Sequence, residues 1–115
     1  MYVRVLQIKF PNELAKNSVN ALSRDMTKEF FKSGLLLRFN TDTSPNSLMI
    51  TLLWEKKELF DIARKKYGDK FVAEVKEMGG IVTISDGLSE IDRAKEIDLS
   101  KLFFDWSKFI PGSLA

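Results

Sequence analysis

Five side chains in this sequence have the chemistry to act on a small molecule, and they are Gln7, Arg38, Trp54, Arg64 and Tyr67. An indole such as Trp54 can stack on a planar ligand, and the Tyr67 hydroxyl can donate a proton. Each has an ordinary alternative, since Trp54 can fill the core and Tyr67 can pack with its hydroxyl in water. Gln7 falls in the middle of an expected central strand, where a polar side chain lines a wet cavity or needs a partner. Arg38 on an edge strand and Arg64 on a helix can serve a ligand or be solvated, and Arg38 can also lie across a dimer interface.

The chain contains no cysteine and no histidine. Disulfides, thiol nucleophiles and a Ser-His-Asp triad are therefore impossible within one chain. Zinc, haem-iron and blue-copper sites lose their usual ligands, which leaves only hard cations bound by carboxylates. We predict no metal site and no cofactor.

The charge and hydropathy pattern argues against two kinds of binding partner, nucleic acid and membranes. The 18 basic and 16 acidic residues give a net charge of +2, too balanced for the basic stripe that nucleic acid requires. The longest uncharged apolar run, residues 48–54, is far shorter than the roughly 20 residues that span a bilayer. Polar and apolar residues alternate at the N-terminus, which therefore lacks the continuous apolar core of a signal peptide. We therefore expect a cytoplasmic protein that binds neither nucleic acid nor membrane.

The residue pattern predicts two strand-helix-strand halves of one domain. Strands are expected at 2–10, 35–40, 48–54 and 81–85, helices between Asn12 and Ser33 and between Trp54 and Gly79, and turns at 41–47 and 86–87. The second helix should be interrupted at Gly68-Asp69, and the first should carry an apolar stripe that includes Leu22. This order indicates a ferredoxin-like βαββαβ fold of the α+β class, with an antiparallel sheet and the first and third strands central. We expect this domain at 1–93 and a helical C-terminal extension at 94–115.

The expected sheet has apolar residues on both faces. In residues 48–54, Trp54 and its alternating neighbours point one way, while Met49 and Leu53 point the other. Two helices cover only one side, so the second side needs a partner sheet or the aromatic C-terminal segment. We predict a homodimer clasped by the extension, with contacts from Met49, Leu53, Phe103, Trp106 and Phe109.

Residues 47–71 read SLMITLLWEKKELFDIARKKYGDKF, and GGIVTI follows at 79–84. An apolar strand that ends in Trp54 precedes a helix that opens with Glu55 and Glu58, and Phe60 and Phe71 follow. This arrangement resembles the antibiotic biosynthesis monooxygenase-like family of dimeric α+β barrels over roughly residues 2–90.

The resemblance implies a ligand pocket between sheet and helices, with Trp54 on its wall. Gln7 stands where active members carry an Asn, and Arg64 stands where haem-degrading members carry a His, so haem breakdown is not expected. The resemblance also implies a cofactor-independent monooxygenase acting on a small aromatic or oxygenated metabolite. Arg64, Arg38 or Gln7 would then stabilise the substrate anion.

Two functions are consistent with this sequence, and the presence or absence of a pocket in the protein interior distinguishes them. For a small-molecule-binding protein we expect an enclosed pocket of about 300 Å³ or more, with Gln7 or Trp54 on its wall. For a non-catalytic interaction or regulatory module that uses the aromatic tail we expect a packed interior. RNA binding on the sheet is rejected, because Met49, Thr51 and Leu53 offer neither aromatic nor basic side chains.

Overall fold

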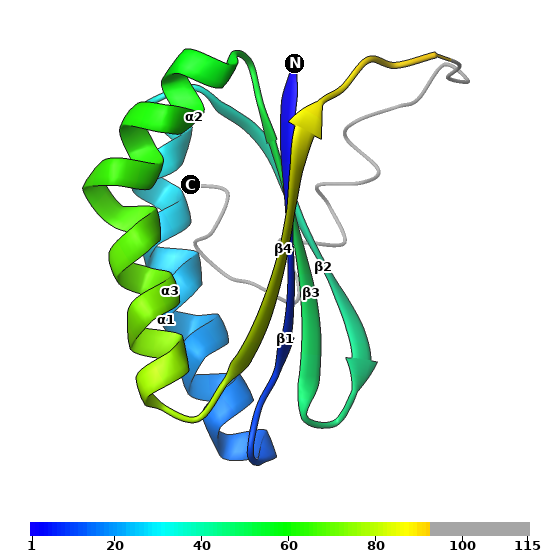
Figure 1. The fold of residues 1–115 in the computed structure, drawn as a ribbon, viewed down its shortest axis with the longest axis vertical. Coiled ribbons are helices and arrows are strands. Elements are labelled where there is room, and N and C mark those ends of the chain that lie inside the picture. The colour runs from blue at the N-terminus through cyan, green and yellow to red at the C-terminus, as the bar shows by residue number, and fades with distance from the viewer. Residues whose placement is uncertain (93–115) are drawn as a thin grey trace.

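The computed structural model describes residues 1–92, which form one helical layer on one face of a sheet (Figure 1). The elements follow the predicted order: β1 (Tyr2–Lys9), α1 (Glu13–Phe31), β2 (Leu35–Ser44), β3 (Ser47–Trp54), α2 (Lys57–Ala63), η1 (Arg64–Gly68), α3 (Asp69–Glu77) and β4 (Ile81–Leu88). The ferredoxin-like α+β prediction is therefore confirmed. The expected extension at 94–115, with Phe103, Trp106 and Phe109, lies outside the described residues.

The sheet has the strand order β2-β3-β1-β4, and each neighbouring pair is antiparallel. β1 and β3 are central, as the crossover rules predicted. Both alternate strictly, so that even-numbered residues from Tyr2 to Ile8 and from Leu48 to Trp54 are buried beneath the helices. Odd-numbered residues of the same strands point to the opposite face, which we call the outer face.

Helix α1 begins where the sequence indicated, because the Ala15 N–H donates to the Asn12 side chain at 2.8 Å. Its buried side is less apolar than predicted. Leu22 is 50% exposed, whereas Ser23 and Thr27 are buried. The apolar stripe was wrong at this position because polar side chains of α1 face an arginine of β2 rather than the apolar centre of the sheet.

The second helical segment is continuous but changes its winding. The predicted interruption at Gly68-Asp69 is a π-helical turn, η1, between α2 and α3. Asp69 does not cap the following helix; its carboxylate instead accepts a hydrogen bond from Arg64 Nη1 at 2.8 Å. A π-turn inserts one extra residue without breaking the helix, and such turns are frequent at functional sites.

Two strands are longer than predicted. β2 extends to Ser44 and leaves only Pro45 and Asn46 between it and β3. β4 extends through Asp86 and Gly87, the residues expected to form a turn, to Leu88. Turn-forming residues remain extended here because the ladders continue past them: Asp86 lies directly opposite Arg4 in β1.

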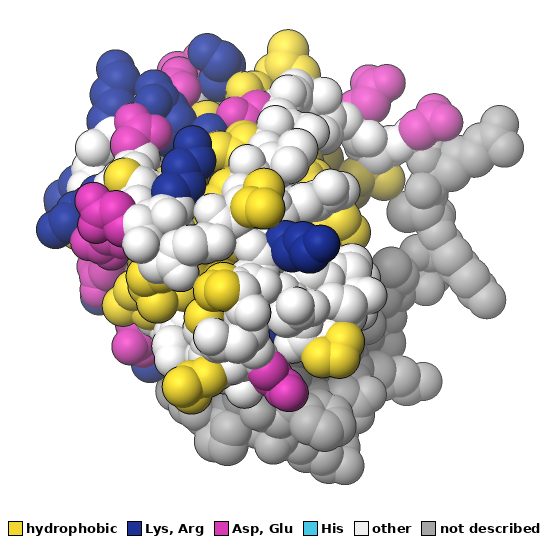
Figure 2. All heavy atoms as spheres, turned by 60° about the horizontal axis from the view of Figure 1, so that its bottom comes forward, with side chains coloured by type: hydrophobic (Ala, Val, Ile, Leu, Met, Phe, Trp, Pro, Cys, Tyr) yellow, Lys and Arg dark blue, Asp and Glu magenta, His cyan; other side chains and the backbone are white. Residues whose placement is uncertain are grey.

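The outer face carries apolar side chains, and no helix of residues 1–92 lies over them. Val3, Val5, Met49 and Leu53 are half-buried there, and Phe39 of β2 is 41% exposed. The helical layer differs, since lysine, arginine, aspartate and glutamate side chains gather over it at the left of Figure 2. The helices therefore present a solvated surface, and the outer face is the side of the sheet that no other element of residues 1–92 covers. Among residues 1–92, no helix has the length and hydropathy needed to cross a membrane.

Candidate functional site

A small cavity lies between the sheet and the second helical segment, at the predicted position beside Trp54. Its volume is about 20 Å³, and it is lined mainly by apolar and aromatic side chains together with Arg4 and Arg64. The expected pocket of about 300 Å³ was wrong for this state of the protein, because aromatic rings fill most of the space. A cavity of this size holds about one water molecule.

Trp54 forms the centre of that aromatic packing. It is 1% exposed, and its ring makes edge contacts with Phe30 at 5.1 Å and with Phe60 at 5.9 Å between centroids. The Trp54 Nε1–H is buried and has no acceptor among the described residues. Burial of an unpaired N–H costs about 1–3 kcal/mol. The residue therefore fills the core and also leaves a hydrogen-bond donor available.

Arg4 adds a charge to the same cavity. Its Nε and Nη2 atoms donate to Asp86 Oδ1 and Oδ2, each at 2.8 Å. The guanidinium also lies over the Phe60 ring, 4.7 Å from its centroid. The charge of Arg4 is thus compensated by a bidentate carboxylate, which holds its guanidinium in place at the cavity wall.

Arg64 reaches the cavity from the π-turn η1. Its Nη1 atom donates to Asp69 at 2.8 Å, and its Nε atom lies 4.0 Å from Asp61. Its side chain is partly exposed, so this guanidinium stands between the cavity and solvent. Of the five predicted residues, only Trp54 and Arg64 line this cavity.

The structure places the other three candidates elsewhere. Gln7 is exposed on the outer face, where its amide nitrogen lies 3.8 Å from the Met49 sulfur, so the pocket position predicted for it was wrong. Tyr67 lines an open groove of about 220 Å³ between α1 and α3, with Leu22 and Met26. Arg38 lies beneath α1, in a polar cluster of its own.

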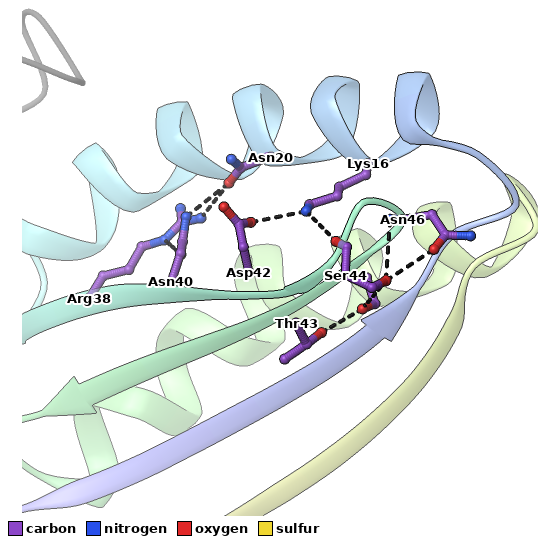
Figure 3. A network of polar contacts seen from close by, with 9 residues as sticks. Lys16, Asn20, Arg38, Asn40, Asp42, Thr43, Ser44 and Asn46 are labelled. Atoms are coloured by element: carbon purple, nitrogen blue, oxygen red, sulfur yellow. Dashed lines mark hydrogen bonds and ion pairs between the residues drawn. The ribbon is translucent and has the colours of Figure 1, made fainter.

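The Arg38 cluster joins β2 to α1 (Figure 3). Arg38 is 5% exposed, and its guanidinium donates only to neutral oxygens. The four acceptors are Thr27 Oγ1 at 2.7 Å, Ser23 Oγ at 2.8 Å, Asn40 Oδ1 at 3.1 Å and Asn20 Oδ1 at 3.2 Å. Burial, with a smaller effect from the Arg24 charge, lowers the pKa of Arg38 to about 10. Nearby, Lys16 Nζ pairs with Asp42 at 3.0 Å and donates to the Ser44 carbonyl.

Sequence reasoning missed the polar side of α1. Lys16, Asn20, Ser23 and Thr27 recur at intervals of three or four residues, which places them on one side of a helix. This polar stripe opposite an arginine of the following strand was the available signal. Within residues 1–92, no group of acidic side chains is arranged to hold a metal ion.

Comparison with known proteins identifies the fold. No protein-family model and no curated protein sequence matches the chain. Solved structures do match. A protein of the antibiotic biosynthesis monooxygenase family from Deinococcus radiodurans has a TM-score of 0.66 at 16% identity, over 85% of this chain and 99% of that one.

The fold is that of the antibiotic biosynthesis monooxygenases. SnoaB of Streptomyces nogalater, a cofactor-independent oxygenase, has a TM-score of 0.58 at 14% identity, over 77% of this chain and 92% of its own. A dimeric ferredoxin-like protein from an uncultured marine organism has a TM-score of 0.54 at 15% identity, over 80% of this chain and 98% of its own. The family resemblance inferred from residues 47–71 is confirmed at the level of the fold.

Proposed function

We propose that this protein binds a small oxygenated molecule beside Trp54. The observation that carries the proposal is the buried Trp54 Nε1–H, which has no acceptor and belongs to a residue that lines a cavity. A carbonyl or phenolate oxygen supplies the missing acceptor and recovers the cost of the unpaired N–H. Arg64, at the solvent side of the same cavity, supplies positive charge to an anionic ligand.

Entry of such a ligand requires the cavity to widen. The cavity of about 20 Å³ holds one water, so a ring must displace that water and move the wall. The π-turn η1 contributes Arg64 and Gly68 to the wall and is the irregular part of the second helical segment. A shift of this turn opens the cavity without moving β3, which is central in the sheet.

The catalytic form of the proposal is a cofactor-independent oxygenase. In that chemistry the ionised substrate itself reduces O₂, and the protein stabilises the anion. The Trp54 N–H and the Arg64 guanidinium suit that role. The structural similarity to SnoaB supports the catalytic form of the proposal, since SnoaB is described as a cofactor-independent oxygenase.

Thermal unfolding in the presence of phenols, quinones and lactones tests the ligand proposal. A ligand at one hundred times its Kd adds about 2.7 kcal/mol to the free energy of unfolding. The matched variant Trp54→Phe keeps an aromatic ring but removes the N–H, so it should lose most of that stabilisation. Equal stabilisation of both proteins, or none by any compound, contradicts the proposal.

We also propose that two copies pair through their outer faces. The half-buried Val5, Met49 and Leu53, with the exposed Phe39, form the apolar surface that a second sheet would cover. The marine neighbour is described as dimeric, which supports this arrangement. Sedimentation equilibrium should show a dimer that Leu53→Lys dissociates, while Ile62→Lys on the exposed side of α2 does not.

A second candidate is a non-catalytic dimeric module. The small cavity volume favours it, because a packed interior needs no ligand. A protein that dimerises through the outer face, yet gains no stability from any compound in the thermal screen, would fit this function.

A further inference from the structure

The interface between α1 and β2 contains two arginines and no carboxylate that contacts either one within the described residues. Arg38 is buried there, and Arg24 lies one residue beyond Ser23, the hydroxyl that accepts from Arg38 Nη2. The Arg24 charge is close enough to lower the pKa of Arg38. Two like charges close to each other repel, and the repulsion is screened less when one of them is buried, as Arg38 is, so an anion beside them is stabilising.

Hydrogen-bond donors remain unused in this interface. A guanidinium has five N–H groups, and Arg38 makes four hydrogen bonds, which leaves one N–H of Nη1. Arg24 Nε is buried and has no acceptor. Native structures rarely leave such a donor unpaired, so an acceptor absent from residues 1–92 is expected at this place.

The nearest acidic residues along the chain have other partners. Asp42 of β2 pairs with Lys16 at 3.0 Å, and Asp25 of α1 lies 3.9 Å from Lys28. Figure 3 shows Asp42 directed toward Lys16, with Arg38 and Asn40 on the other side of it. Neither carboxylate therefore compensates the two arginines.

The cluster also reaches the surface. Arg24, Asn20 and Asn40 are each half-buried, whereas Arg38 behind them is buried. The Asn40 side-chain nitrogen donates to Asn20 Oδ1 at 3.1 Å, so the neutral amides are bonded to each other and hold Arg38 in place. The partly exposed Arg24 is therefore the solvent side of the cluster, and Arg38 is its buried end.

We propose that Arg24 and Arg38 form an oxyanion-binding site between α1 and β2, separate from the cavity beside Trp54. The fork geometry of two guanidinium groups fits the oxygens of a phosphate or carboxylate group. The bound group would accept from Arg24 Nε and from the free N–H of Arg38. The ligand is thus a small phosphorylated or carboxylated molecule, or the free ion itself.

Titration of the full chain with inorganic phosphate tests the site, with acetate as a separate arm at the same ionic strength. Proton–nitrogen NMR of the arginine Nε–H groups reports on Arg24 directly, and calorimetry measures the affinity. We expect phosphate or acetate to move the Arg24 Nε–H signal in a saturable way. The stronger of the two ions identifies the chemical group that the site prefers.

The variant Arg24→Gln should weaken anion affinity at least tenfold while the protein remains folded, because Arg24 is partly exposed. Arg24→Lys keeps the charge but loses the fork, so its affinity should fall between those of the wild type and Arg24→Gln. Lys65→Gln removes an exposed charge from the π-turn and should leave affinity unchanged.

The wild-type titration overturns the proposal if neither ion moves the Arg24 signal. The variants overturn it if Arg24→Gln binds phosphate as tightly as the wild type. Phosphate stabilises most proteins by exclusion from their surface, so a rise in Tm equal in wild type and Arg24→Gln also counts against the site.

Discussion

Arg4 and Arg38 are buried on the same face of the same sheet, but their surroundings differ in one respect. Arg4 of β1 has a bidentate carboxylate partner in Asp86 and an aromatic ring beneath it. Arg38 of β2 has four neutral oxygens and a second arginine nearby. Neutral acceptors satisfy the N–H groups of a guanidinium but leave its charge uncompensated. The Arg4 end of the sheet is therefore electrostatically complete, whereas no carboxylate of residues 1–92 compensates Arg38.

The largest expected effect comes from removing the carboxylate that Arg4 depends on. Asp86→Asn leaves a buried guanidinium opposite a neutral amide. Breaking a buried pair in this way costs about 3–5 kcal/mol, and the partial exposure of Asp86 reduces the expected loss to about 2–3 kcal/mol. Urea denaturation measures it. A loss no larger than that of the exposed control Asp25→Asn would show that Arg4 does not need its partner.

A smaller effect should appear at alkaline pH and be specific to Arg38. Its pKa is lowered to about 10 by burial and by Arg24, so the folded chain releases this proton before the unfolded chain does. Where the unfolded state binds more protons, the free energy of unfolding rises with pH. Between pH 9 and 11 the wild type should therefore gain about 1 kcal/mol relative to Arg38→Met.

Urea denaturation of both proteins at each pH checks this difference, since other titrating groups contribute equally to both and cancel. A constant gap between the two proteins would mean that the folded chain keeps the proton on Arg38, either because Arg38 is not desolvated or because an anion compensates its charge. In both cases the unfolded chain also keeps this proton up to pH 11, so no pH dependence remains.

The smallest effect is expected for Arg38→Met at neutral pH. Replacing an uncompensated buried charge with an apolar side chain of similar length is often close to neutral, so the change should stay within about 1 kcal/mol of the wild type. Ser23 and Thr27 keep backbone carbonyls as acceptors for their hydroxyls. Urea denaturation should thus rank Arg38→Met well below Asp86→Asn. If Arg38→Met destabilised the protein more than Asp86→Asn, the two arginines would not differ in how their charges are compensated.

Two of the five predicted site residues lie at the cavity beside Trp54, so the candidate site was only partly predictable from the sequence. Trp54 and Arg64 were expected near one ligand position, and they do line one cavity. Gln7 was assigned to the same position, but the alternation of β1 turns it to the outer face together with Val3 and Val5. The strand pattern predicts that Gln7 points to the face of the sheet opposite to that of Leu6 and Ile8. Which of the two faces is the interior depends on where the helices pack.

Local pattern in the sequence determined the order of the elements, the cap at Asn12, the central position of β1 and β3 and the two apolar faces of the sheet, because periodicity and capping act over a few residues. Tertiary structure alone decided which charges are compensated. Arg4 meets Asp86 across 82 positions of the chain, and only the pairing register of β1 with β4 brings them together. The same register extends β4 through a sequence that is typical of a turn. Long-range pairing depends on the sum of many weak contacts, so no short segment of the sequence specifies it.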